Sequence, residues 1–115
     1  MEIKLEISKE LFNEVAKTWA KKIKYNKMTS TQLRNYYDKV LELYEEAQIN
    51  DFDEVLPFVK MLNSKVSYGV GRGVVSREFE KMMNICINQI ETKKDLEIFK
   101  YFFEAVLGFY KGENR

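Results

Sequence analysis

The chain has 115 residues and carries 19 lysine and arginine residues against 18 aspartate and glutamate residues, so its formal net charge is only +1. Hydrophobic residues make up 45% of the sequence and charged residues 32%, which is typical of a globular protein and excludes an extended disordered chain. The absence of histidine excludes imidazole catalysis, and the single cysteine excludes an internal disulfide.

Cys86 lies in the apolar run Met82–Ile87, and we expect it to be a buried core residue in a reducing compartment. The longest uncharged stretch, residues 82–90, is well short of the ~18 residues that cross a bilayer. Residues 1–7 mix acidic and apolar residues and do not resemble a targeting signal. These features together predict a cytoplasmic protein with no membrane anchor.

One proline and five glycines leave few helix breaks, and apolar residues recur at helical spacing along most of the chain. We expect an all-α fold, a compact bundle of about five helices that forms a single helical domain over residues 1–115. Residues 1–7 alternate apolar and polar positions, but a lone strand would have no partner. An ordered arm and an extra helical turn are both compatible with them.

The first helix is expected to begin near Ser8, a good N-cap, with Ile7 and Phe12 placed to form a hydrophobic staple. Its second half is rich in lysine, which suits the negative end of the helix dipole and is otherwise a solvated face. The second helix is predicted over residues 30–48, because Thr29 and Gln32 have the spacing of a capping box.

Pro57 is expected in the first turn of a third helix, where its missing N–H costs least. The glycine-rich residues 69–73 end or loosen this helix, since glycine is a poor helix former. Ser76 is predicted to cap a fourth helix. Thr92 lies three residues before Asp95 and is predicted to cap a fifth helix.

Carboxylates are the main remaining candidates for catalysis. Asp38, Glu42 and Glu45 share one face of the predicted second helix and could hold a hard cation, although acids on an exposed helix face are common. The glycines of residues 69–73 lack the spacing of a dinucleotide loop and the Lys-Ser/Thr pair of a P-loop. We therefore predict a non-catalytic protein that uses no metal or cofactor.

A basic segment spans residues 57–77, which contain no acidic residue and the basic residues Lys60, Lys65, Arg72 and Arg77. On a continuous helix Lys65, Gly69 and Arg72 share one face, with Tyr68 beside them. Lys65 and Arg72 would lie about 10 Å apart along the axis, so that each could meet a different phosphate. Gly69 is expected to let a nucleic-acid strand approach closely. The near-neutral net charge weakens the case for nucleic acid, so a protein partner stays open.

Three segments, in this order, resemble the small helical subunit of the type III-A CRISPR-Cas effector, the Csm complex: Thr29–Asn35, Leu62–Arg72 and Phe99–Lys111. The first is similar to a capped helix start with an Arg-Asn pair. The second is similar to a Leu-x-x-Lys-aromatic-x-Tyr-x-Ala-Gly-Arg segment, and the third to a terminal aromatic-Phe-Glu-Ala-Leu helix. Together they lie within residues 29–111 and leave the first helix, within residues 1–28, outside the resemblance.

Individual residues both match and depart from that family pattern. Arg34, Lys65 and Arg72 match it. The chain departs from the pattern at three positions. It has Val66 where the family often has an aromatic residue, Asn63 where the family commonly has a second basic residue, and Tyr101 where an arginine is common.

The resemblance implies a non-catalytic RNA-binding subunit of a cytoplasmic antiviral complex, present in several copies along the duplex of guide RNA and target RNA. Its implied partners are these RNAs and other Csm subunits. Eight Phe, seven Tyr and one Trp are also more than so small a domain is expected to bury, which predicts self-association. The alternative is a helical adaptor that binds only protein. The residues expected to bind RNA are Lys65, Arg72, Arg34, Lys60, Tyr68 and Arg77.

Overall fold

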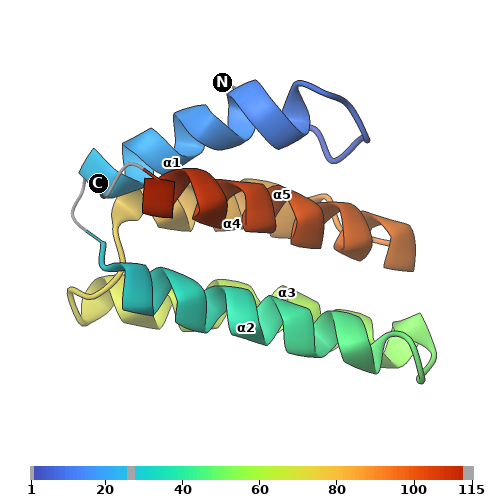
Figure 1. Cartoon of the computed structure of the whole chain (residues 1–115). Helices are drawn as coiled ribbons and strands as arrows, with labels where there is room; N and C mark the ends of the chain where they lie inside the picture. The colour runs from blue at the N-terminus through green and yellow to red at the C-terminus, as the bar shows by residue number, and fades with distance from the viewer. Residues whose placement is uncertain (1, 26–27, 113–115) are drawn as a thin grey trace.

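The computed structural model describes residues 2–25 and 28–112 (Figure 1). Its helices are α1 (Ala16–Tyr25), α2 (Ser30–Glu46), α3 (Phe52–Gly71), α4 (Arg77–Asn88) and α5 (Lys93–Gly112), and a π-helical turn, η1 (Leu11–Val15), leads into α1. The described residues contain no strand. The prediction of an all-α, compact bundle of about five helices is confirmed.

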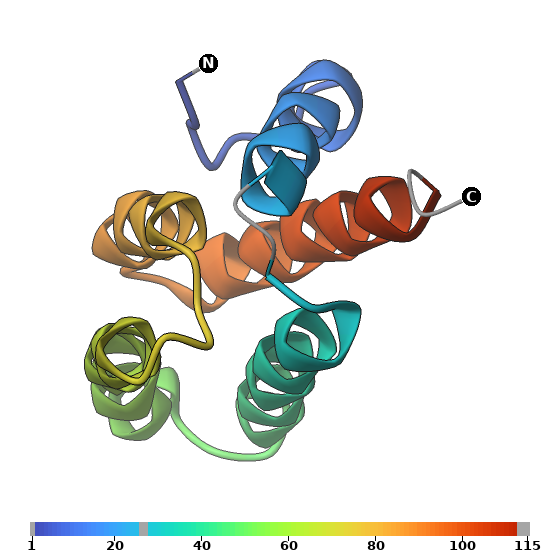
Figure 2. The same cartoon turned by 90° about the vertical axis from the view of Figure 1, so that its left-hand side faces the viewer.

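The helix α5 lies at the centre of the bundle. It packs against η1 and α1 on one side and against α2 on the other, while α3 packs against α4 and α2. The end-on view in Figure 2 shows α1 and α2 on opposite sides of α5, with α3 alongside α2. Among the described helices, α3 packs mainly against α4 and α2. Much of its remaining surface is therefore exposed to solvent.

The core is built around aromatic side chains of α5. Phe99, Phe102 and Phe103 have no exposed surface. The ring centroid of Phe103 lies 5.8 Å from that of Phe79 on α4 and 5.5 Å from that of Tyr37 on α2. Both pairs meet edge to face, an arrangement that contributes about 0.5–1.5 kcal/mol beyond the buried area. These contacts connect three helices at one point.

Three predicted N-caps are confirmed. The side-chain oxygens of Thr29, Ser76 and Thr92 each accept a hydrogen bond of 3.1 Å from the backbone N–H three residues later. Ser8 accepts a similar bond from the Leu11 N–H at 3.0 Å, but the N-cap of the first helical segment is Glu10, so the predicted cap at Ser8 is wrong. The helix α2 ends at Glu46, two residues before the predicted end. The predicted staple between Ile7 and Phe12 is wrong, because the Ile7 side chain is 64% exposed.

Pro57 does not lie in the first turn of α3, as predicted, but is the sixth residue of the helix, which begins at Phe52. Asp53 and Glu54 occupy the first turn, where their charges are favourable at the positive end of the helix dipole. Pro57 lies on the exposed side of α3, so its ring disturbs no packed neighbour.

The glycine-rich segment ends α3 in a Schellman motif. Gly73 has a φ of +78°, its N–H donates to the Val70 carbonyl at 3.0 Å, and the Val74 N–H donates to the Gly69 carbonyl at 3.1 Å. Gly69 itself is buried, and a Cβ there would lie 2.5 Å from Val75 Cγ2. The expectation that Gly69 leaves room for a nucleic-acid strand is therefore wrong: Val75 and Tyr36 fill that space.

The N-terminal residues form an ordered arm rather than an extra helical turn. The Gln89 side chain, at the end of α4, accepts a hydrogen bond from the Leu5 N–H at 3.1 Å and donates one to the Ile3 carbonyl at 2.8 Å. Ile3 and Leu5 are buried, and Ile7 beyond them is not. The alternation of residues 3 and 5 thus places two apolar side chains in the core without a strand partner.

We predict that Gly69→Ala destabilises the fold by about 1–3 kcal/mol, the usual cost of overpacking a core site. Gly108→Ala is the matched control, since it lies on α5 with open space around it and should be neutral or stabilising. Urea unfolding of both variants measures the difference. A Gly69→Ala variant as stable as the wild type would contradict the packing described here.

The Tyr37 hydroxyl donates a hydrogen bond to Glu104 of α5 at 3.0 Å. Burial has the largest effect on the pKa of Tyr37 and this hydrogen bond the second largest, and the pKa is raised to about 12. A raised phenol pKa means that Tyr37 stabilises the folded state below the unfolded-state pKa of about 10, and that this contribution is lost as pH rises towards 12. We therefore predict that wild type loses more stability than Tyr37→Phe between these pH values, as measured by urea unfolding. Parallel losses in the two proteins would contradict it.

Candidate nucleic-acid interface

A groove of about 470 Å³ lies between α2 and the second half of α3. Polar side chains line it from both helices: Gln32, Asn35 and Lys39 from α2, and Ser64, Lys65 and Tyr68 from α3. Its floor is fixed by Tyr36, whose hydroxyl donates to the Lys65 carbonyl at 3.2 Å. None of the residues that line this groove is acidic, so the groove presents hydrogen-bond donors and positive charge. We call it the basic half, because a second hollow continues it between the same two helices.

Two of the predicted site residues, Lys65 and Tyr68, line this groove, and Arg72 lies beside it over the Tyr68 ring. Lys65 is exposed, Tyr68 is 69% exposed, and the guanidinium carbon of Arg72 lies 5.7 Å from the centroid of the Tyr68 ring. Arg72 is also close enough to Tyr36 to lower its pKa, although burial has the larger effect and raises that pKa overall. The arrangement offers two cations with an exposed aromatic ring between them.

Lys60 lies elsewhere. Its ammonium group donates to the Ile87 carbonyl at 2.8 Å, in the last turn of α4, and lies 3.6 Å from the Glu91 carboxylate. A cation in this position satisfies a carbonyl at a helix C-terminus and suits the negative end of the helix dipole. The structure therefore places Lys60 between α3 and α4 and not in the groove.

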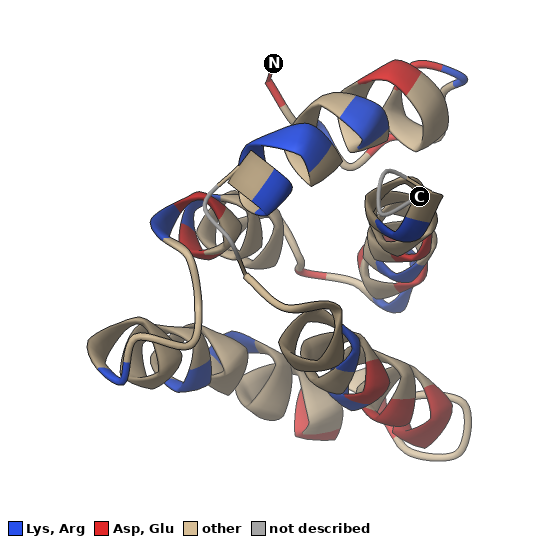
Figure 3. Ribbon diagram, turned by 60° about the vertical axis from the view of Figure 1, so that its left-hand side comes forward, with Lys and Arg blue, Asp and Glu red and all other residues tan. Residues whose placement is uncertain are grey.

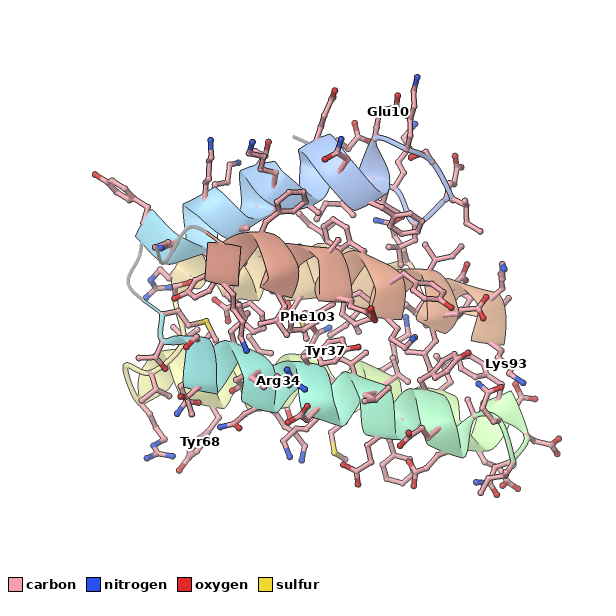
Figure 4. The ribbon with its side chains drawn as sticks, viewed as in Figure 1. Glu10, Arg34, Tyr37, Tyr68, Lys93 and Phe103 are labelled. Carbon is pink, nitrogen blue, oxygen red and sulfur yellow. The ribbon has the colours of Figure 1, made fainter. Side chains whose placement is uncertain are left out.

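Arg34 and Arg77 also lie outside the groove. Arg34 forms an ion pair with Asp38 at 3.1 Å and lies over the ring of Tyr37, on the side of α2 that faces α5. Figure 4 shows Arg34 and Tyr68 projecting in different directions from the α2–α3 pair. Arg77 is the exposed first residue of α4.

Lys39 is a groove residue that the sequence reasoning missed. It is exposed and lies opposite Lys65. The signal was present in the helical spacing of Gln32, Asn35 and Lys39, which lie on neighbouring positions of one side of α2. That spacing does not reveal which other helix adjoins this side.

The other half of the groove has a different character. Here a smaller hollow of about 240 Å³ is lined by Glu42 and Glu46 of α2 and by the exposed apolar residues Phe58 and Met61 of α3. Lys39 and Lys65 line this hollow as well as the larger one. Figure 3 shows acidic residues gathered where α2 leads into α3. The groove thus runs from an acidic and apolar end to a basic end.

Among the described residues, the carboxylates and the cysteine give no second candidate site. Within residues 2–25 and 28–112 no three Cys, Asp or Glu side chains gather closely enough to hold a metal ion. Cys86 is fully buried, and burial raises the pKa of its thiol, which disfavours the reactive thiolate. None of the described helices is long and apolar enough to cross a membrane.

The comparison with protein families identifies the chain over nearly its whole length. The family described as Csm2 Type III-A matches residues 6–115, and so includes residues 6–28, which the three resembling segments do not cover. No curated protein and no solved structure matches the chain. With nearly its whole length matched, the chain belongs to the Csm2 Type III-A family and is a structural subunit of a type III-A CRISPR-Cas complex.

Proposed function

We propose that this subunit binds RNA without reading its sequence, through the groove lined by Lys39, Lys65 and Tyr68 and through Arg72 beside it. Several copies lie along the duplex of guide RNA and target RNA in a cytoplasmic antiviral Csm complex, and contact one another and other Csm subunits. The observation that carries this proposal is the basic half of the groove, whose lining includes no acidic residue. In such a complex base pairing supplies sequence specificity, so phosphate contacts are sufficient for the protein.

The geometry of α3 suits a nucleic-acid backbone. Lys65 and Arg72 are about 10 Å apart along the helix axis, which allows each to meet a different phosphate. Tyr68 lies between them with most of its ring exposed and can stack on a base or pack on a ribose. Asn35 and Ser64 supply further hydrogen-bonding groups that suit phosphate oxygens and the ribose 2′-hydroxyl.

The net charge of only +1 is consistent with a subunit that lies beside its own copies, since strong self-repulsion would oppose that arrangement. We also propose that the protein is not an enzyme: Asp38 is paired with Arg34, and Glu42 belongs to a groove lined by lysines as well as acids.

A helical adaptor that binds only protein is the competing proposal. It is favoured by exposed aromatic side chains outside the basic half of the groove, namely Tyr25, Phe58 and Tyr101. Binding of RNA by the isolated protein separates the two proposals.

We predict that Lys65→Ala with Arg72→Ala weakens binding of two unrelated RNAs to the same extent. Each lost phosphate contact should flatten the slope of log affinity against log salt by roughly 0.7–0.9, so the double variant should lose about twice that. Fluorescence anisotropy over a salt series measures both quantities, and circular dichroism checks the fold. The control is Lys93→Ala with Lys111→Ala, which removes the same charge from exposed positions of α5. A folded double variant with unchanged affinity and slope would show that the groove is only a solvated surface.

Two single variants test the assignment of residues to the groove. Lys39→Ala is expected to flatten the salt slope by roughly 0.7–0.9, as for one phosphate contact. Lys60→Ala should leave the slope unchanged and lower the free energy of unfolding, because its ammonium group is bound to the end of α4. If Lys60→Ala flattens the salt slope and Lys39→Ala does not, in the same anisotropy experiments, the RNA contact lies on the α3–α4 side and the assignment is wrong.

A further inference from the structure

A second basic surface lies where the end of α1 meets the start of α4. The hollow there has a volume of about 670 Å³ and is lined by three lysines, one glutamate and one tyrosine, namely Lys21, Lys22, Tyr25, Glu78 and Lys81. Glu78 is already paired with Lys81 at 3.4 Å, so the lining keeps a net positive charge. Tyr25 is 87% exposed and places an aromatic ring beside the lysines, as Tyr68 does in the α2–α3 groove.

The packing of the bundle accounts for only part of this charge. The helix α1 contains four lysines and no acidic residue (Figure 3), but only Lys22 and Lys24 lie in its last turn, where the helix dipole favours cations. Arg77 is the exposed first residue of α4, at the positive end of a helix dipole, where a cation is unfavourable. Among the described residues neither Lys21 nor Arg77 has an ion-pair partner, so both charges are open to an external anion. We call Arg77 and the five lining residues of the hollow the α1–α4 surface.

The positive charge of the α1–α4 surface continues that of the groove. Arg72 is the C-cap of α3, and Arg77 begins α4 only five residues later. Arg77 and Lys81 are one helical turn apart, about 6 Å along the axis of α4, and Lys81 lines the same hollow as Lys21. Figures 1 and 2 show the end of α1, the start of α2 and the α3–α4 turn at the same end of the bundle. A strand that follows α3 towards its C-terminus therefore meets cations of α3, α4 and α1 in succession.

We propose that a single-stranded stretch of RNA leaving the α2–α3 groove continues over the α3–α4 turn and binds the α1–α4 surface. Lys21 and Arg77 contact its phosphates, and Tyr25 stacks on one of its bases. This inference rests on the RNA binding proposed above and extends it to a second part of the molecule. Phosphate contacts and stacking carry no sequence information, so the extended contact is also independent of sequence.

A nucleic-acid strand fits this surface better than an acidic protein segment. The cations follow a path that begins in the groove, and each half of the path has an exposed tyrosine ring, Tyr68 and Tyr25. Every base offers a flat face to such a ring, whereas an aspartate or glutamate side chain does not. The low net charge does not oppose binding here, because residues 40–59 hold six acidic residues and no basic one, and the α2–α3 turn lies at the other end of the bundle (Figure 1).

RNA length separates the two surfaces in a test on the full chain. A uridine oligomer of about 4 nucleotides can occupy the groove alone, whereas one of about 16 nucleotides can also reach the α1–α4 surface. On the longer RNA, Lys21→Ala with Arg77→Ala should flatten the slope of log affinity against log salt by about 1.4, since each lost phosphate contact to a single strand contributes about 0.7. On the shorter RNA the same variant should bind like wild type, while Lys65→Ala with Arg72→Ala should weaken the binding of both. Fluorescence anisotropy over a salt series measures these quantities.

The matched control is Lys9→Ala with Lys93→Ala. It also removes two exposed positive charges, but at the other end of the bundle, where Figure 4 labels Lys93 and the neighbouring Glu10. This control should leave the slope for both RNAs unchanged, and circular dichroism checks the fold of every variant.

Trp19 supplies a second readout, which does not depend on affinity. It is the only tryptophan of the chain and is 4% exposed, and the Lys22 ammonium lies 4.5 Å from the centroid of its ring. A phosphate that attracts Lys22 should therefore shift the tryptophan emission, although the ring itself is buried. At saturating RNA we expect this shift with the longer RNA and not with the shorter one.

Three results would overturn the extended path. The first is a folded Lys21→Ala with Arg77→Ala variant that binds the longer RNA with unchanged affinity and slope. The second is an equal loss for the shorter and the longer RNA, because the two surfaces would then not act in series. The third is a poly-glutamate peptide that binds wild type more tightly than the longer RNA and loses affinity in this variant, which would assign the surface to an acidic protein segment.

The same experiments keep this inference apart from the function proposed for the groove. If only Lys65→Ala with Arg72→Ala weakens binding, the groove stands and the α1–α4 surface is a solvated face. If only Lys21→Ala with Arg77→Ala weakens binding, the groove fails and the RNA site is the α1–α4 surface. A wild-type protein that binds neither RNA would contradict both.

Discussion

The edge-to-face contact between Phe79 of α4 and Phe103 of α5 is the point at which α2 is anchored in the bundle. Tyr36 packs on the first ring and Tyr37 on the second, so two consecutive residues of α2 are held by two different helices. A helix held in this way cannot rotate about its axis. The fixed orientation of α2 about its axis places Lys39 on the side that faces α3 and Arg34 on another side. The set of residues that line the groove therefore follows from the aromatic core.

Local signals in the sequence were sufficient for the ends of most helices. Thr29, Ser76 and Thr92 cap helices through bonds that span three residues, and such bonds depend little on the rest of the fold. Pro57 was misplaced because a proline is most often found in the first turn of a helix, whereas α3 begins at Phe52 and contains the proline as its sixth residue. The N-terminal arm depends on Gln89, more than eighty residues away.

The same distinction holds for the candidate site. Lys65 and Tyr68 belong to α3 and Arg72 is its C-cap, so helical periodicity alone places them together. Lys39 enters the groove from α2, and Lys60 leaves it for the end of α4, because of packing between helices that periodicity does not describe. Gly69 shows the limit most clearly: a residue on the face expected for a ligand serves instead to bring Val75 and Tyr36 against the helix.

The antiparallel arrangement of α2 and α3 also governs the electrostatics of the groove. Gln32 in the first turn of α2 adjoins Tyr68 near the end of α3, so the positive end of one helix dipole lies beside the negative end of the other. The two backbone contributions largely cancel at both ends of the groove. The electric field of the groove consequently comes mainly from its side chains, and exchange of a few surface lysines for acids would make the same groove attract a cationic ligand.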